Sequence, residues 1–265
     1  MGTPRPTLRL VGKAEQPRAV GSRDASLDVT DALQVYSTNT ASRLDGLSGF
    51  VFKKDSPSCG MERVKVYNDK GMPQRDGTGI FARAVQKANP LLPVEEEGRL
   101  NDPVLRENFV SRVFVYARWQ GLLQQGLSKK ALLDFHTSHK LLLMAHSPAA
   151  YRELGRMLAV LGKVELDQLA GLYILRVMQV LKKPASRKRH VNVLQHILGY
   201  LRKHLDATSR ADLVDVIDSY RRGTVPLVVP ITLLQHSFRR RPHPWISRQV
   251  YMQPHPGELM LRNTI

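Results

Sequence analysis

The chain has 265 residues, a hydrophobic content of 42% and a formal net charge of +17, from 40 Lys and Arg against 23 Asp and Glu. Its length allows a substantial core in one large or two modest domains. The sequence shows no apolar run long enough to cross a membrane, no secretory signal in residues 1–20, and a single cysteine, which excludes an internal disulfide framework. We therefore expect a cytoplasmic protein that does not associate with membranes.

The first hundred residues alternate between strand-like and helix-like segments. This alternation, with short connections, is typical of a doubly wound α/β sheet, and we expect an incomplete Rossmann-like α/β domain over residues 1–100. The run Gly77-Thr78-Gly79 could offer backbone amides to an anion, but a plain turn is the preferred interpretation. Strands are predicted at 8–11, 49–53, 63–67 and 91–94, a turn at 68–73, and helices at 29–44 and 79–87.

After residue 105 almost every segment has helical periodicity. We expect a connecting helix over 101–127 and an all-α helical domain over 128–265, with helices at bundle-like spacing. Ser128 is the predicted cap of the first helix, and Ser209 with Asp212 resembles a capping box before the fifth. The chain beyond residue 230 is expected to be irregular. The predicted helices span 129–146, 151–161, 166–181, 188–205 and 211–220.

The excess of positive charge is concentrated in two clusters, which favour a polyanionic partner such as nucleic acid or a nucleotide. The second cluster is flanked by aromatic residues, and arginine beside an aromatic ring can hold phosphate and stack on bases. Solvated basic loops are an equally favoured alternative, since no specific nucleic-acid-binding motif is present. The clusters are Arg187, Lys188 and Arg189, and Arg239, Arg240 and Arg241.

Histidines on two predicted helices form a second candidate site. If their faces converge, they would make a polar pocket for a metal, a phosphate or a base. Their spacing is no known metal signature and no carboxylate shares the stripe, so an anion pocket with Lys140 is favoured over metal. Buried histidines that are hydrogen-bonded inside a bundle are the main alternative. The residues are His136, His139, Lys140 and His146 on one helix, and His190, Asn192 and His196 on another.

Cys59 follows the apolar run at residues 49–52 and lies in a loop of Asp, Ser, Pro and Gly residues. A thiol placed after a strand, beside Gly60 and below Lys53 and Lys54, can act as a nucleophile or a metal ligand. A small buried residue is the simpler interpretation, because free cysteine is commonly part of a core. Chemistry alone favours the simpler interpretation.

The run Phe52-Lys53-Lys54-Asp55-Ser56-Pro57-Ser58-Cys59-Gly60 resembles the signature of the thiouracil desulfurase family. This resemblance covers roughly the first hundred residues. It implies that Cys59 is one of three cysteines that hold an iron–sulfur cluster, and that Ser48 lies in the active site. From about Leu132 onward the chain resembles the YbgA-like domain, whose activity is not established. That match is carried by residues 135–140, 143–146, 190–196 and 226–230.

The family pattern also contains a Ser-x-Cys-Leu-Leu-Gly loop and a Cys-Pro-Glu segment, which are absent here. The chain opens at residues 1–6 with a segment similar to the part that follows Cys-Pro-Glu. One thiolate cannot hold a cluster that needs three protein ligands. We therefore expect a truncated or mis-started reading frame, with no cofactor for the chain as written and a [4Fe-4S] cluster if the missing cysteines are encoded upstream.

Two functions follow from these expectations, beside a third hypothesis of a truncated protein whose helical half supports or docks partners. The first is a bacterial protein that resembles an iron–sulfur-dependent desulfurase of thiolated bases fused to a YbgA-like domain, and that is inactive as a desulfurase in this form. The alternative is a nucleic-acid or nucleotide-binding accessory protein that acts through the basic helical domain.

Overall fold

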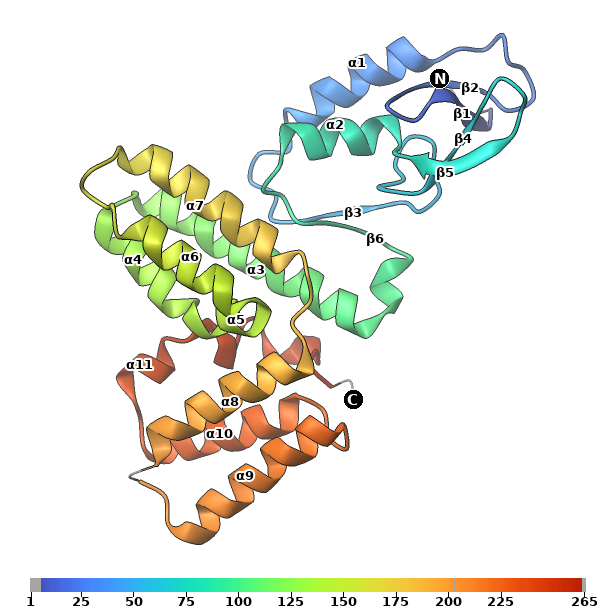
Figure 1. Cartoon of the computed structure of the whole chain (residues 1–265). Coiled ribbons are helices and arrows are strands. Elements are labelled where there is room, and N and C mark those ends of the chain that lie inside the picture. Colours follow the sequence, from blue (N-terminus) through green and yellow to red (C-terminus); the bar gives the residue numbers. More distant parts are fainter. Residues whose placement is uncertain (1–5, 203, 264–265) are drawn as a thin grey trace. The chain divides into compact units, whose positions relative to one another are not determined.

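The computed structural model describes residues 6–202 and 204–263 (Figure 1). The chain divides into two compact units, an α/β unit, Met1–Asn101, and a helical unit, Asp102–Ile265. Residues 1–5, where the sequence departs from the desulfurase pattern, lie outside the described residues. Within the described part of the chain, no helix is both long and apolar enough to cross a membrane.

The strands of the α/β unit form two small sheets. The first sheet has four strands in the order β2-β1-β4-β5, and the second pairs β3 with β6 in parallel. The elements are β1 (Leu8–Lys13), β2 (Gln16–Gly21), α1 (Thr30–Ala41), β3 (Phe50–Phe52), β4 (Val64–Tyr67), β5 (Pro73–Gly77), α2 (Ile80–Ala88), β6 (Val94–Glu96) and the short 3-10 helix η1 (Arg99–Asn101).

The predicted α/β class is confirmed, but its strands do not form one doubly wound sheet. Only β1 and β4 are parallel neighbours in the larger sheet, and each also has an antiparallel hairpin partner, β2 and β5. Both outer edges of the β1–β4 pair are thus occupied, so β3 pairs with β6 instead. The predicted turn at 68–73 is confirmed, and it joins β4 to β5.

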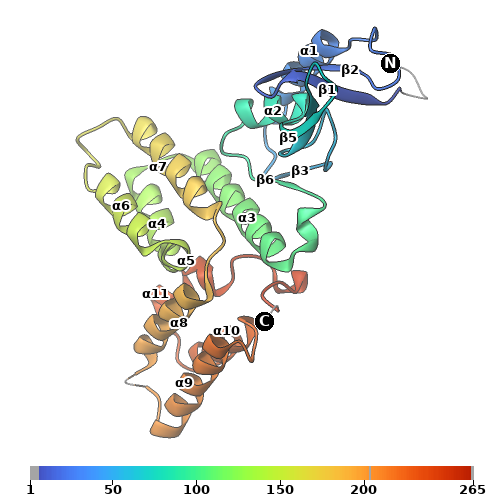
Figure 2. The same cartoon turned by 45° about the vertical axis from the view of Figure 1, so that its right-hand side comes forward.

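One hydrophobic core holds the four-stranded sheet and its two helices together. Helices α1 and α2 lie side by side in both views (Figures 1 and 2) and contact each other. Removing these apolar side chains from water is the main force that stabilises the unit. The buried members of the core are Leu10, Ala19, Val29, Val64, Val66 and Ile80.

The helical unit confirms the all-α prediction for the second part of the chain. Helix α3 corresponds to the predicted connecting helix and belongs to this unit. The helices are α3 (Pro103–Gln125), α4 (Lys129–Ser138), α5 (Lys140–His146), α6 (Pro148–Leu158), α7 (Leu166–Leu181), α8 (Arg187–Leu201), α9 (Ala207–Arg222), α10 (Val228–Arg240) and α11 (Pro244–Ser247), followed by the 3-10 helices η2 (Val250–Met252) and η3 (Gly257–Leu259).

Two predictions about the ends of helices have different outcomes. Ser128 does cap α4, because its hydroxyl accepts a hydrogen bond from the amide of Ala131 at 3.1 Å. The capping box of Ser209 and Asp212 is wrong, because α9 begins three residues earlier than that box requires. Asp206 is the cap, and its carboxylate accepts from the amide of Ser209 at 2.7 Å.

The segment after residue 230 was expected to be irregular, and this is wrong. It contains most of α10, which packs with α8 and α9 as Figures 1 and 2 show, and the short helix α11. Pro230 lies within the first turn of α10, where a missing amide hydrogen removes no helical hydrogen bond. The proline is therefore compatible with the helix and does not end it.

The predicted helix at 129–146 is broken at His139, so α4 and α5 are separate helices. The carbonyl oxygen of Phe135 accepts three hydrogen bonds at this point. They come from the Ser138 hydroxyl at 3.0 Å, His139 Nδ1 at 2.7 Å and the His139 amide at 3.1 Å. Side chains that bond a nearby carbonyl compete with regular helix geometry, which explains the break.

Candidate functional site

The loop that carries Cys59 follows the end of β3 in the α/β unit. The Cys59 amide donates to the Ser56 hydroxyl at 3.1 Å, and the two hydroxyls of Ser56 and Ser58 lie 3.1 Å apart. The Ser58 hydroxyl in turn lies 3.4 Å from the sulfur of Cys59, which is partly exposed. A short chain of polar contacts therefore leads to the thiol, and Cys59 is not the fully buried core residue of the simpler interpretation.

The start of α2 is bound tightly to this loop. The amides of Gly79 and Phe81 donate to the carbonyls of Gly60 at 2.8 Å and Ser58 at 2.9 Å. A Cβ at Gly79 would lie 2.3 Å from the Ser58 carbonyl oxygen, so only glycine permits this close approach. Since loop carbonyls already occupy these amides, the run Gly77-Thr78-Gly79 does not present them to an anion, in agreement with the plain turn.

Glu97 holds the two lysines that precede the loop. Its carboxylate forms an ion pair with the ammonium of Lys53 at 2.8 Å and accepts from the amide of Lys54 at 2.8 Å. The hydrogen bond between the side chains raises the pKa of Lys53 and lowers the pKa of Glu97. The Lys53 ammonium therefore pairs with a carboxylate, whereas we expected from the sequence that it would lie beside the Cys59 thiol.

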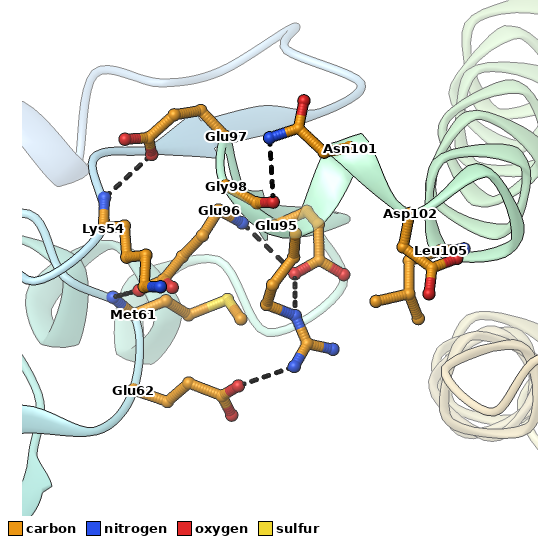
Figure 3. A network of polar contacts seen from close by, with 11 residues as sticks. Lys54, Met61, Glu62, Glu95, Glu96, Glu97, Gly98, Asn101, Asp102 and Leu105 are labelled. Atoms are coloured by element: carbon orange, nitrogen blue, oxygen red, sulfur yellow. Dashed lines mark hydrogen bonds and ion pairs between the residues drawn. The ribbon is translucent and has the colours of Figure 1, made fainter.

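Acidic residues of β6 fix the other end of the same loop (Figure 3). Glu96, which is buried, accepts from the amide of Met61 at 2.8 Å. Glu95 is also buried and accepts from Arg99 at 2.7 Å, and Arg99 continues to Glu62 at 2.8 Å. The sequence analysis missed these residues. A sequence signal for them exists, because three consecutive glutamates directly follow an apolar segment. A carboxylate that is buried there needs a hydrogen-bonding or charged partner.

Ser48, the predicted active-site serine, lies two residues before β3 and is partly buried. The Cys59 loop follows the opposite end of this strand. Ser48 and Cys59 therefore lie on either side of β3 in the chain, and the active-site role of Ser48 stays a prediction.

The residues present do not fit a cluster that needs three cysteines. The sequence contains one cysteine, Cys59. Among residues 6–202 and 204–263, no three His, Cys, Asp or Glu side chains are grouped so that they could hold a metal ion. Iron–sulfur clusters are held by several cysteine thiolates, and this chain supplies one.

In the helical unit the predicted histidines separate into two groups. His146 and His190 line a small cavity of about 40 Å3, together with Arg262. His146 Nδ1 donates to the Lys183 carbonyl at 2.8 Å, and His190 Nδ1 lies 2.9 Å from the Tyr251 hydroxyl. Burial lowers the pKa of His146 to about 4 and that of His190 to about 3. Both rings are therefore neutral at pH 7, and the cavity has room for little more than a water molecule.

The second group surrounds Lys140, whose ammonium lies 5.4 Å from the ring centre of Trp245 and 5.8 Å from that of Tyr151. His136 stacks on Tyr151 with ring centres 5.0 Å apart. Tyr200 stacks on Trp245 at 5.0 Å and also contacts His196. Burial and the nearby charge of Lys140 lower the pKa values of His136 and His196. Aromatic rings thus connect the two predicted faces around Lys140.

Two of the predicted residues belong to neither group. The His139 ring stacks on Phe135 with centres 4.0 Å apart, and burial lowers its pKa to about 4. Asn192 is exposed on α8. The predicted pocket of all seven residues therefore does not form as one site.

Two residues of the first basic cluster contact other groups of the helical unit. The Arg187 guanidinium lies 5.8 Å from the ring centre of Tyr220, and Arg189 donates to the carbonyl of His146. These residues begin α8, where positive charge opposes the helix dipole, so their internal contacts offset an unfavourable position. Arg187 and Lys188 are exposed, as are the residues of the second cluster, Arg239, Arg240 and Arg241, at the end of α10. These contacts give no support to the nucleic-acid interpretation.

Comparisons with known proteins match each unit separately. The family described as 2-thiouracil desulfurase matches residues 1–97, and the family described as protein of unknown function (DUF1722) matches residues 140–256. The uncharacterized protein YbgA of Escherichia coli (strain K12) is 39% identical over 154 residues, which are 58% of this chain and 91% of that protein. No solved structure matches the chain.

Proposed function

Because the chain belongs to the YbgA family through its helical unit and matches 2-thiouracil desulfurase through its α/β unit, we propose that it is a desulfurase-like protein in which Cys59 marks the position of a cluster ligand. We further propose that a chain of this sequence does not itself carry out cluster-dependent desulfuration. The observation that carries this proposal is the single thiol of Cys59, in a loop that contains no second cysteine.

The backbone of the Cys59 loop is nevertheless held in place by hydrogen bonds to neighbouring elements. Glu96 and Glu97 hold its two ends, and the start of α2 holds its middle, so the thiol is presented from a fixed backbone. Such support is the usual requirement for a residue that must reach one position accurately. This supports a retained desulfurase-like framework whose ligand set is incomplete in this sequence.

The test is anaerobic reconstitution of the full chain with iron and sulfide, beside the matched variant Cys59→Ser. We expect neither protein to hold a stoichiometric cluster, and neither to release sulfide from 2-thiouracil. Iron content, labile sulfide and the visible absorption of a cluster are the measurements. Circular dichroism of both proteins confirms that they are folded.

One stoichiometric cluster in the wild-type chain that Cys59→Ser abolishes would contradict the proposal. A cluster shared between several chains, each supplying its Cys59, would contradict it as well. Sedimentation of the reconstituted protein distinguishes that case from a cluster held by one chain.

A further inference from the structure

A cavity of about 580 Å3 lies in the helical unit at the junction of α10, α11 and η2. Its volume is in the range of cavities that bind small molecules. Both basic and apolar side chains line it, and one of them, Arg239, belongs to the second basic cluster that the sequence predicted to bind a polyanion. The residues that matter for its chemistry are Phe238, Arg239, His243, Ile246 and Arg248.

Two glutamines fix the walls of this cavity. The side-chain amide of Gln235, on α10, donates to the carbonyl of Met252 in η2 at 2.8 Å. Gln249 is buried between the cavity and the α4–α5 junction, where it donates to the Thr137 carbonyl at 2.9 Å and accepts from the Leu141 amide at 3.3 Å. These bonds tie the segment after α11 to regular helices, so the cavity is formed in advance of any ligand.

The charges around the cavity favour a negatively charged ligand. Arg248 is paired with Asp134 at 2.9 Å, whereas Arg239 is exposed and pairs with no carboxylate in the part of the chain that the structure describes. Among the described residues, no Asp or Glu lines the cavity. The charge of Arg239 is therefore not compensated within the cavity, and one anionic group of a ligand can neutralise it.

The remaining walls suit the organic part of such a ligand. Phe238 and Ile246 are buried and give the cavity an apolar surface. His243 also lines the cavity.

We propose that this cavity binds a small organic anion, whose carboxylate or phosphate group is held by Arg239 and whose apolar body lies against Phe238 and Ile246. The site lies in the helical unit and goes beyond the proposed function of the α/β unit. It can therefore be confirmed or rejected independently of the chemistry at Cys59.

The test is isothermal titration of the full chain, at physiological salt, with phenyl phosphate, benzoate and the uncharged benzyl alcohol. We expect at least one of the two anions to bind at one site per chain, and the alcohol to bind at least about tenfold more weakly. Tighter binding of phenyl phosphate assigns the site to phosphate esters, and tighter binding of benzoate assigns it to carboxylates.

The decisive variant is Arg239→Gln, with Arg240→Gln as its matched control. Both substitutions remove one positive charge from exposed neighbouring positions of α10, but Arg240 does not line the cavity. We expect Arg239→Gln to weaken anion binding by about tenfold or more, and Arg240→Gln by less than about twofold, because salt screens a distant charge.

Three results would overturn the proposal. The first is no binding of either anion. The second is equal weakening by Arg239→Gln and Arg240→Gln, which would show attraction to general surface charge. The third is binding of a single-stranded oligonucleotide without binding of either small anion, which would assign the arginines to an extended polyanion surface.

Discussion

At the scale of single residues, burial decides the charge state of the central histidines. Desolvation is the main cause that lowers the pKa of His139 and His146 to about 4 and that of His190 to about 3. In His139 and His146, Nδ1 bonds a backbone carbonyl, which can only accept, so Nδ1 carries the proton of the neutral ring. These histidines are structural groups that an acidic medium would charge.

This burial predicts that the helical unit loses stability in acid. An unfolded histidine has a pKa near 6.5, so below that pH the unfolded state binds more protons than the folded state. The free energy of unfolding should be highest above about pH 6.5 and fall as the pH decreases toward about 4. Urea unfolding followed by the fluorescence of Trp119 and Trp245, both in the helical unit, measures it.

The variant His190→Gln should make this pH dependence shallower, by up to about 1.4 kcal/mol per pH unit, because one titrating group is removed. His236→Gln is the matched control, since His236 is exposed on α10 and its replacement should leave the slope unchanged. An unaltered slope in His190→Gln would show that His190 does not contribute to acid destabilisation.

At the scale of elements, the helix caps show where local sequence signals compete. Two capping signals lie near the start of α9, Asp206 just before the helix and the pair of Ser209 with Asp212 inside it, and the structure uses the first. The Asp206 carboxylate accepts from both the amide and the hydroxyl of Ser209, at 2.7 and 2.9 Å. These hydrogen bonds lower the pKa of Asp206, so the ionised form is the one that caps the helix.

We therefore predict that Asp206→Ala lowers the melting temperature of the helical unit by about 2–4 °C, because the first turn of α9 loses its side-chain acceptor. Asp212→Ala should leave the melting temperature unchanged, since this exposed residue lies within the helix and is not its cap. Thermal unfolding followed by circular dichroism compares the two variants. A larger effect of Asp212→Ala would restore the capping box that the sequence predicted.

The sequence predicts those elements whose signal is local and repeated. Helix α7 was predicted with its exact limits, because apolar residues recur along it at helical spacing. Strands β2 and β5 were missed, because polar residues occupy many of their positions. They form only because each pairs in a hairpin with the neighbouring strand, β1 or β4. The helix break at His139 depends on side-chain bonds to Phe135, which a pattern of apolar residues does not contain.

In the candidate sites, too, the local motifs could be predicted from the sequence, but the contacts between distant residues could not. The motif around Cys59 could be seen in the sequence, but Glu96, at the end of β6, and Glu97, just after it, contact this loop from more than thirty residues later in the chain. Except for His139, which lies at the break between α4 and α5, the predicted histidines lie on helices. Only the structure shows that Trp245 and Tyr200 connect the two faces around Lys140. The cavity beside Arg239 arises from a segment that was expected to be irregular.

At the scale of the whole molecule, each unit has a hydrophobic core of its own. The α/β core is built on Leu10, Val64 and Val66, whereas the helical unit buries residues such as Leu154 and Leu194 completely. A domain with its own core can in principle fold alone. The pairing of a desulfurase-like unit with a YbgA-like unit is thus a fusion of two separately built parts.

We predict that residues 102–265 expressed alone unfold cooperatively, with a free energy of unfolding within about 0.5 kcal/mol of that of the helical unit in the full chain. Urea unfolding followed by tryptophan fluorescence serves for both proteins. A substantially less stable fragment would show that the α/β unit contributes to the stability of the helical unit.

The carbonyl group of Phe135, at the junction of α4 and α5, has a consequence for spectroscopy. Three donors converge on its oxygen, and each of them draws electron density from the carbon–oxygen double bond. A double bond weakened in this way vibrates at a lower frequency than the carbonyls of regular helix. An isotope label at this one carbonyl would thus give an infrared band of its own, which reports directly on the local geometry of the junction.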